Sequence, residues 1–177
     1  MVQIPREACP EERSDEWARD DILGFLEEIK DPEVPVLAVV ELGIVRDVRV
    51  AEQGVTVVIT PTYSGCPAMH IIEDDIRAGL EAHGVRPVKI ETVFVPAWTS
   101  DWISAEAKQK LVDYGIAAPG RAADEGGLVT LTRRAPVACP YCKSTRTTLK
   151  SEFGSTACKS INFCNDCRQP FEQFKAI

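Results

Sequence analysis

Cys139-Pro140-Tyr141-Cys142 begins a pattern that Cys164-Asn165-Asp166-Cys167 repeats near the end of the chain. A two-residue spacer lets both sulfurs of a pair turn toward one ion, and two pairs complete a tetrahedral shell of four thiolates. Such a shell leaves no position open for a substrate, so the sequence predicts a structural metal site. The residues between the pairs slightly exceed the ~15–20 usual in this motif, a small difference for a zinc ribbon.

The alternative is that these four cysteines are buried or form disulfides. Metal-ligand spacing occurs twice, which favours a metal. The chain has 7 cysteines, an odd number, and does not look like a secreted disulfide framework. We therefore expect reduced thiols and a four-cysteine zinc ribbon, although four sulfurs suit iron as well as zinc.

Composition limits the class of protein. The 177 residues are 45% hydrophobic and 27% charged, which is typical of soluble globular domains and sufficient for one ordinary domain with a small second one. No apolar run approaches the ~20 residues of a membrane span, and the acidic start does not resemble a signal peptide, so we expect a cytoplasmic protein without a membrane partner. The net charge of −7 argues against nucleic acid, although the segment after Thr130 is basic.

The hydrophobic pattern upstream of the cysteine pairs predicts a small α/β sandwich with helices on one face of a three-stranded mixed sheet. The expected order is a helix ending at Lys30 with Ser14 or Asp15 as its cap, an antiparallel hairpin of strands 44–50 and 55–60, a helix with Met69, Ile72, Ile76 and Leu80 on one stripe, a strand over 88–95, and a helix over 104–114.

The domain organisation that follows has four parts. Residues 1–17 are a polar N-terminal arm, and residues 18–116 form the α/β domain. Residues 117–134 contain Pro-Gly and Gly-Gly and are expected to be a linker. Residues 135–177 form the ribbon.

Cys66 is the candidate reactive residue of the α/β domain. It precedes a helix, whose N-terminal N–H groups favour an anion and are expected to lower the pKa of its thiol. The alternative is an inert buried cysteine. Asp31 and Glu33 either cap turns or face Cys66. His70, four residues after Cys66, is best interpreted as an exposed or capping residue.

Two of the three tryptophans, Trp98 and Trp102, lie in one loop. Tryptophans in such a place usually pack, but two together can also anchor an interface. We therefore consider this loop a candidate docking site for a partner.

Several stretches together resemble the SufT-like family of metal-sulfur cluster assembly domains over residues 18–116. They are Asp31-Pro32-Glu33-Val34-Pro35, Glu41-Leu42-Gly43-Ile44-Val45, Tyr63-Ser64-Gly65-Cys66-Pro67 and Pro96-Ala97-Trp98-Thr99-Ser100-Asp101-Trp102. The cysteine pairs, with residues 151–159 and 170–175, are more narrowly similar to PaaD, a family of small subunits encoded with phenylacetyl-CoA epoxidase. Glu41 stands where the family usually has Asp, and the linker lacks the Cys/His cluster of some relatives.

The resemblance implies a role without catalytic turnover of its own. Members of the family help to insert or repair iron-sulfur or di-iron centres in client proteins, here the phenylacetyl-CoA oxygenase and its iron-sulfur reductase in phenylacetate catabolism. The cysteine of the Cys-Pro turn is functional in that family, which points to Cys66, with Asp31 and Glu33 nearby. The expected cargo is a transient iron ion or iron-sulfur cluster, beside a structural zinc in the ribbon.

Other interpretations stay open. The basic ribbon is compatible with a nucleic-acid-binding module, and the chain could instead be a purely structural oxygenase subunit. One thiolate cannot complete a cluster's shell, so a homodimer holding a cluster between two copies of Cys66 is a further expectation. Cys158 is a spare thiol, an additional ligand or a core residue.

Overall fold

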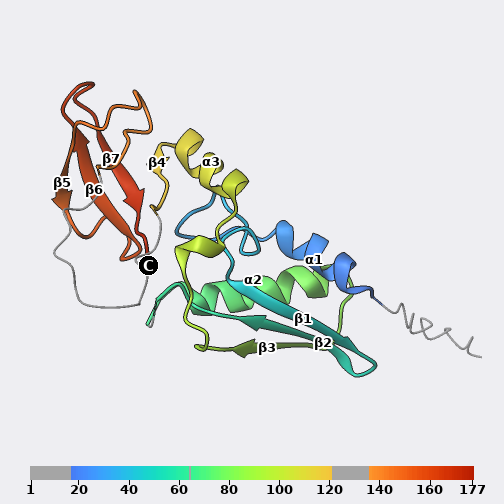
Figure 1. Ribbon diagram of the computed structural model, residues 1–177. Helices are drawn as coiled ribbons and strands as arrows, with labels where there is room; N and C mark the ends of the chain where they lie inside the picture. The colour runs from blue at the N-terminus through green and yellow to red at the C-terminus, as the bar shows by residue number, and fades with distance from the viewer. Residues whose placement is uncertain (1–16, 64, 121–135) are drawn as a thin grey trace, which may run out of the picture.

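The computed structural model describes residues 17–63, 65–120 and 136–177 (Figure 1). Its elements, in chain order, are α1 (Arg19–Glu27), β1 (Val45–Ala51), β2 (Gly54–Ile59), α2 (Met69–Ala82), β3 (Val88–Thr92), the 3-10 helix η1 (Ser100–Trp102), α3 (Ala105–Tyr114), β4 (Ile116–Ala117), β5 (Thr147–Ser151), β6 (Lys159–Cys164) and β7 (Pro170–Phe174).

The first sheet has the order β1-β2-β3 and confirms the predicted three-stranded mixed sheet. β1 and β2 form an antiparallel hairpin in which Ala51 pairs with Gly54, and β3 returns parallel to β2 after α2. Gly54 has a φ of +124°, and a Cβ there would lie 2.4 Å from the backbone oxygen of Pro87. This turn therefore requires glycine.

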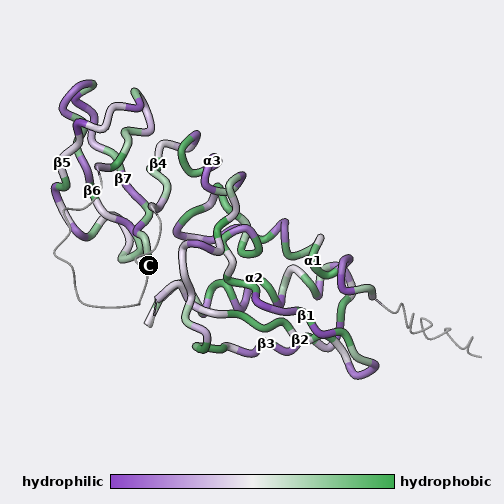
Figure 2. Tube along the Cα trace, viewed as in Figure 1, coloured by the Kyte–Doolittle hydropathy of each residue, from purple (hydrophilic) through white to green (hydrophobic). Residues whose placement is uncertain are grey.

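α1 and α2 cover one face of this sheet (Figure 1). The predicted stripe of α2 is buried throughout, and Figure 2 shows the hydrophobic residues gathered along α2 and β2. α1 begins at Arg19, where the Ala18 backbone N–H donates to Asp21 at 3.0 Å; the expected caps Ser14 and Asp15 lie outside the described residues. Within the part of the chain that the structure describes, no helix is long and apolar enough to cross a bilayer.

Two predicted elements differ in extent. β3 ends at Thr92, so the strand predicted to Val95 is too long, and Phe94 is 61% exposed. Thr92 pairs with Ile59, the last residue of its partner strand β2, so the ladder ends there. α3 begins one residue after Ser104, whose Oγ caps it, and lies beside β4 instead of on the three-stranded sheet.

The second sheet has the order β4-β7-β6-β5 and forms the ribbon. β4 pairs parallel with β7, Ile116 opposite Glu172 and Ala117 opposite Gln173. The expected boundary after residue 116 therefore falls inside β4, and residues 121–134 of the expected linker lie outside the described residues. A strand from the upstream part of the chain thus extends the ribbon sheet.

The two parts of the molecule share one hydrophobic core. Phe174 of β7 is fully buried, and Cys158 is 3% exposed, in the same cluster as the residues between α2 and the first sheet. The Trp98 and Phe174 ring centroids are 6.0 Å apart, and Trp98 Nε1 donates to the backbone oxygen of Leu42 at 3.0 Å. The ribbon is therefore docked against the α/β domain.

Candidate functional site

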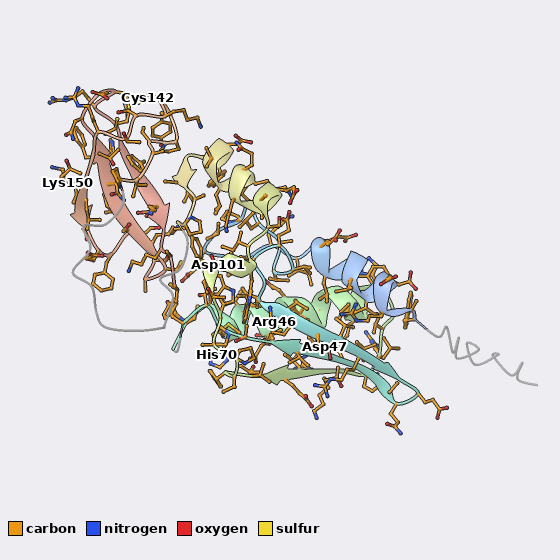
Figure 3. All side chains as sticks on the ribbon, in the orientation of Figure 1. Arg46, Asp47, His70, Asp101, Cys142 and Lys150 are labelled. Atoms are coloured by element: carbon orange, nitrogen blue, oxygen red, sulfur yellow. The ribbon has the colours of Figure 1, made fainter. Side chains whose placement is uncertain are left out.

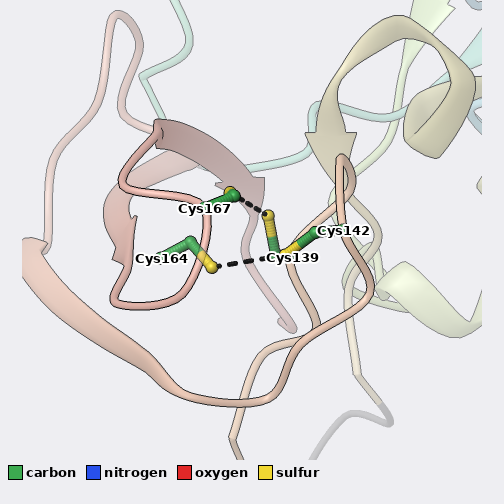
Figure 4. Close-up of side chains that lie close together, drawn as sticks. All are labelled: Cys139, Cys142, Cys164 and Cys167. Carbon is green, nitrogen blue, oxygen red and sulfur yellow. Dashed lines mark hydrogen bonds between the residues drawn. The ribbon is translucent and has the colours of Figure 1, made fainter.

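The four ribbon cysteines meet at one point between two loops (Figure 4). All four sulfurs lie within 4.8 Å of one another; Sγ of Cys139 is 3.7 Å from that of Cys167, and Sγ of Cys142 is 3.5 Å from that of Cys164. A tetrahedron with zinc-sulfur bonds of ~2.3 Å has sulfur-sulfur edges of about 3.8 Å. The spacing of the thiols therefore fits a tetrahedral metal.

The two loops of the metal centre have matching backbones. The N–H of Lys143 donates to Cys139 O at 2.9 Å, and the N–H of Arg168 donates to Cys164 O at 3.0 Å. Lys143 and Arg168 also share a left-handed φ of 63° and 62°, which is uncommon for residues other than glycine. Each Cys-x-x-Cys pair is thus presented by the same tight turn.

The electrostatics of the four thiols favour a bound cation. The backbone N–H groups of Cys167 and Asp166 lower the pKa of Cys164 to about 7. Burial, followed by the neighbouring thiols, raises the pKa of Cys167 to about 12. Four thiolates this close repel one another, and a divalent metal removes that repulsion while taking the place of their protons.

A separate small cavity lies where the ribbon meets the α/β domain. Its wall is largely apolar and includes Phe174, and its polar side chains are Asp31, Glu33, Thr62, Cys66 and Cys158. In Figure 3, Cys142 of the metal centre lies far from His70, which is in the first turn of α2 and near Cys66 in the sequence. The structure thus contains two distinct groups of thiols.

Cys66 lies in the loop before α2, two residues ahead of the N-cap residue Ala68, and its side chain is half-buried. Burial raises the pKa of its thiol, and the charges of Glu33 and Asp31 add to this shift against the hydrogen bond from the Ala68 N–H. The expectation of a lowered pKa is therefore wrong. The helix N-terminus is outweighed by burial and two carboxylates, and the resting thiol is protonated at neutral pH.

Cys158 lies in the loop before β6 and faces the same cavity from the ribbon. Its Sγ lies 3.5 Å from Glu33 Oε2 and 3.0 Å from Thr156 Oγ1. Burial and the charge of Glu33 raise the pKa of Cys158 to about 11, so it donates to the carboxylate as a neutral thiol. No spacing pattern in the sequence links Cys158 to Cys66, and only docking of the ribbon brings Cys158 to the cavity.

Asp31 shapes the loop that carries Glu33. It is 5% exposed, and its Oδ1 accepts the backbone N–H groups of Glu33 at 2.8 Å and Val34 at 2.7 Å. Burial raises the pKa of the Asp31 carboxyl more than these hydrogen bonds lower it. Asp31 is therefore a turn-capping residue, and Glu33 supplies the carboxylate that reaches a thiol.

Replacing Asp31 separates its hydrogen bonds from its charge. Asp31→Ala leaves two N–H groups without partners and should lower the free energy of unfolding by about 1–3 kcal/mol. Asp31→Asn keeps the acceptor, so we expect wild-type stability or more at neutral pH. Because the folded pKa of Asp31 is raised, wild type loses stability as pH rises through that pKa, and Asn does not. Denaturant unfolding of the three proteins at acidic and neutral pH measures this; equal stability of the Ala and Asn variants would contradict it.

The two loop tryptophans do not form an exposed pair. Trp98 is only 4% exposed and belongs to the shared core, so it cannot present the docking surface that the sequence suggests. Trp102 is half-buried, and the Arg46 guanidinium lies 3.5 Å from its ring centroid. His70 is exposed, in agreement with its interpretation from the sequence. The exposed hydrophobic residues nearest to Trp98 in the sequence are Phe94 and Val95.

Known families match both parts of the chain. Residues 19–91 match a family described as iron-sulfur cluster assembly protein, and residues 123–175 match one described as PaaD zinc beta ribbon domain. A structure of a domain of unknown function, DUF59, from Bacillus anthracis has a TM-score of 0.50 and 29% identity, covering 52% of this chain and 90% of that one.

Two named relatives extend these matches. An Fe-S protein maturation auxiliary factor of Porphyromonas gingivalis is 42% identical over 94 residues, 52% of this chain and 89% of its own. A protein of Escherichia coli K12, provisionally named as a component of 1,2-phenylacetyl-CoA epoxidase, is 43% identical over 157 residues, 89% of this chain and 92% of its own. The chain therefore belongs to the PaaD family and joins an iron-sulfur cluster assembly domain to a zinc ribbon.

Proposed function

We propose that the protein is a non-catalytic maturation factor that carries iron or an iron-sulfur cluster on Cys66 to a client. The observation that supports this most is the half-buried Cys66 thiol in a cavity with Glu33, within a domain of the iron-sulfur cluster assembly family. Thiolate is a good ligand for iron and for iron-sulfur clusters. The client we propose is the phenylacetyl-CoA ring-epoxidising oxygenase, including its iron-sulfur reductase.

The raised pKa of Cys66 suits a carrier better than a storage site. A protonated thiol must release its proton before it binds metal, so the proton competes with the cargo and weakens binding at neutral pH. Partial exposure of Cys66 leaves room for a client ligand to approach. A transient complex that passes its metal on by ligand exchange needs both properties.

The ribbon has a different part in this proposal. Its four sulfurs form a closed shell that we propose holds a structural zinc, because no position remains for an incoming ligand. Zinc does not change its oxidation state and would keep β5, β6 and β7 in place beside the cavity. Cargo and structural metal therefore occupy separate thiols.

The client test compares wild type with Cys66→Ala during activation of the iron-free oxygenase by ferrous iron and sulfide. We expect the variant to activate the client no better than a reaction without the protein, while its zinc content and melting temperature stay at the wild-type values. Cys9→Ser, at a cysteine outside the described residues, is the control for loss of a thiol and should activate normally. Full activation by Cys66→Ala, with stoichiometric co-purification, would instead favour a structural subunit.

A further inference from the structure

We propose that Cys158 of the ribbon and Cys66 of the α/β domain bind the same metal ion, with Glu33 as a third ligand. The cargo site would then form only where the two parts of the molecule dock. This inference rests on the proposed function in treating the cavity as the cargo site, and it adds a second thiol to that site. The ligand class is a divalent metal of borderline softness, such as ferrous iron.

The contacts around Glu33 are the first support for a shared metal site. Cys66 and Cys158 line one cavity, and the Cys158 thiol already donates to Glu33 Oε2 at 3.5 Å. Two sulfurs and a carboxylate oxygen therefore face one space.

The ribbon holds Cys158 in position through its neighbours. The backbone N–H of Lys175 donates to Cys158 O at 2.9 Å. The buried ammonium of Lys159 donates to the backbone oxygen of Glu33 at 3.1 Å and lies 3.3 Å from Glu172 Oε2. The loop of Glu33 is thus fastened to the residue next to Cys158, so the two potential ligands stay together.

A purely structural role explains less of this arrangement. A buried cysteine that only fills space does not need a carboxylate partner, and a carboxylate in a largely apolar cavity raises the cost of burial. Asp31 uses its Oδ1 for two backbone N–H groups, whereas the partner that Glu33 Oε2 has in the cavity is a thiol. Two sulfurs and one oxygen leave a fourth position of a tetrahedral ion open, which transfer to a client requires.

Binding must tighten the cavity and release protons. Among the described residues, the ribbon cysteines are the one group of three or more possible ligands whose atoms already lie within 4.8 Å of one another, so Cys66 and Cys158 must approach the ion. Both thiols lose their protons to solvent as two metal-sulfur bonds form, and Glu33 exchanges its thiol hydrogen bond for the metal. No electrons are transferred.

Cobalt(II) added to zinc-loaded full-length protein provides the test. Sulfur-to-cobalt charge-transfer absorption reports thiolate ligands, and a pH indicator counts the protons released. We expect wild type to release about two protons per cobalt bound and Cys158→Ala about one, with roughly half the absorption and at least ~10-fold weaker binding. Zinc released from the ribbon is measured in parallel, and Cys9→Ser should match wild type.

The outcomes separate this inference from the proposed function. Wild-type proton release and affinity in Cys158→Ala, with loss of binding in Cys66→Ala, would overturn the shared site and leave the carrier role of Cys66 intact. Wild-type cobalt binding by Cys66→Ala would contradict both the shared site and the carrier role of Cys66. If Cys158→Ala does not fold, Cys158→Ser, which keeps the size of the side chain and a donor for Glu33, decides: it should release about one proton per cobalt and lose part of the sulfur-to-cobalt absorption, and wild-type proton release with wild-type absorption would refute the shared site.

Discussion

Serine in place of Cys164 should unfold the ribbon and also destabilise the α/β domain. The change removes one of four ligands, and binding to a structural zinc site contributes roughly 10–16 kcal/mol, as much as the whole stability of many domains. The ribbon's own hydrophobic cluster is small, with Ala117, Cys139, Cys164 and Phe171 as its buried members. Without metal the ribbon has few other stabilising contacts. Its unfolding would also remove Phe174 and Cys158 from the shared core.

Thermal unfolding of the full chain, read beside its zinc content, measures this effect. We expect Cys164→Ser to lose zinc and to melt at a clearly lower temperature across the whole protein, and a strong chelator to do the same to wild type. Cys9→Ser should keep both values. A variant that loses zinc while the α/β domain melts at the wild-type temperature would mean that the ribbon is tethered and not docked.

Alanine in place of Phe174 should lower the free energy of unfolding by about 3–5 kcal/mol, the usual cost of removing a fully buried aromatic side chain. Phe174 is 0% exposed and packs between the ribbon sheet and Trp98. The cavity left behind opens the contact between the two parts of the molecule, and the fluorescence of Trp98 should change with it.

Phe153→Ala is the matched control for this change. Phe153 belongs to the same ribbon but is 67% exposed, with the Lys175 ammonium 4.4 Å from its ring centroid. Its removal should change stability by no more than about 0.5 kcal/mol. Denaturant unfolding of both variants gives the comparison, and a similar small loss in each would show that Phe174 does not join the two parts.

Features set by neighbouring residues could be predicted from the sequence. The metal centre follows from two short spacings, and the hairpin and the buried stripe of α2 follow from period-2 and period-3.6 patterns. The ends of the two hairpin strands differ by one residue from the predicted ends, because backbone hydrogen bonds between the strands set them. The mixed sheet also follows, since a helix between β2 and β3 allows a parallel return.

Features set by ribbon docking could not be predicted. Trp98 and Phe174 are far apart in the sequence, and neither lies in a pattern that indicates a shared core. The thiol of Cys66 illustrates the same limit, because its position before α2 predicts a lowered pKa while burial and the carboxylate of Glu33 raise it. Cys158 likewise reaches the cavity of Cys66 only because the ribbon docks there. The cavity around Cys66 depends on contacts between separate loops, and the sequence alone specifies none of them.

Analysis of iron, acid-labile sulfide and zinc in anaerobically purified wild type and Cys66→Ala tests the carrier role most directly. We expect about one zinc per chain in both proteins, because the ribbon shell is closed, and iron with or without sulfide in wild type alone. Iron at the wild-type level in Cys66→Ala would contradict it.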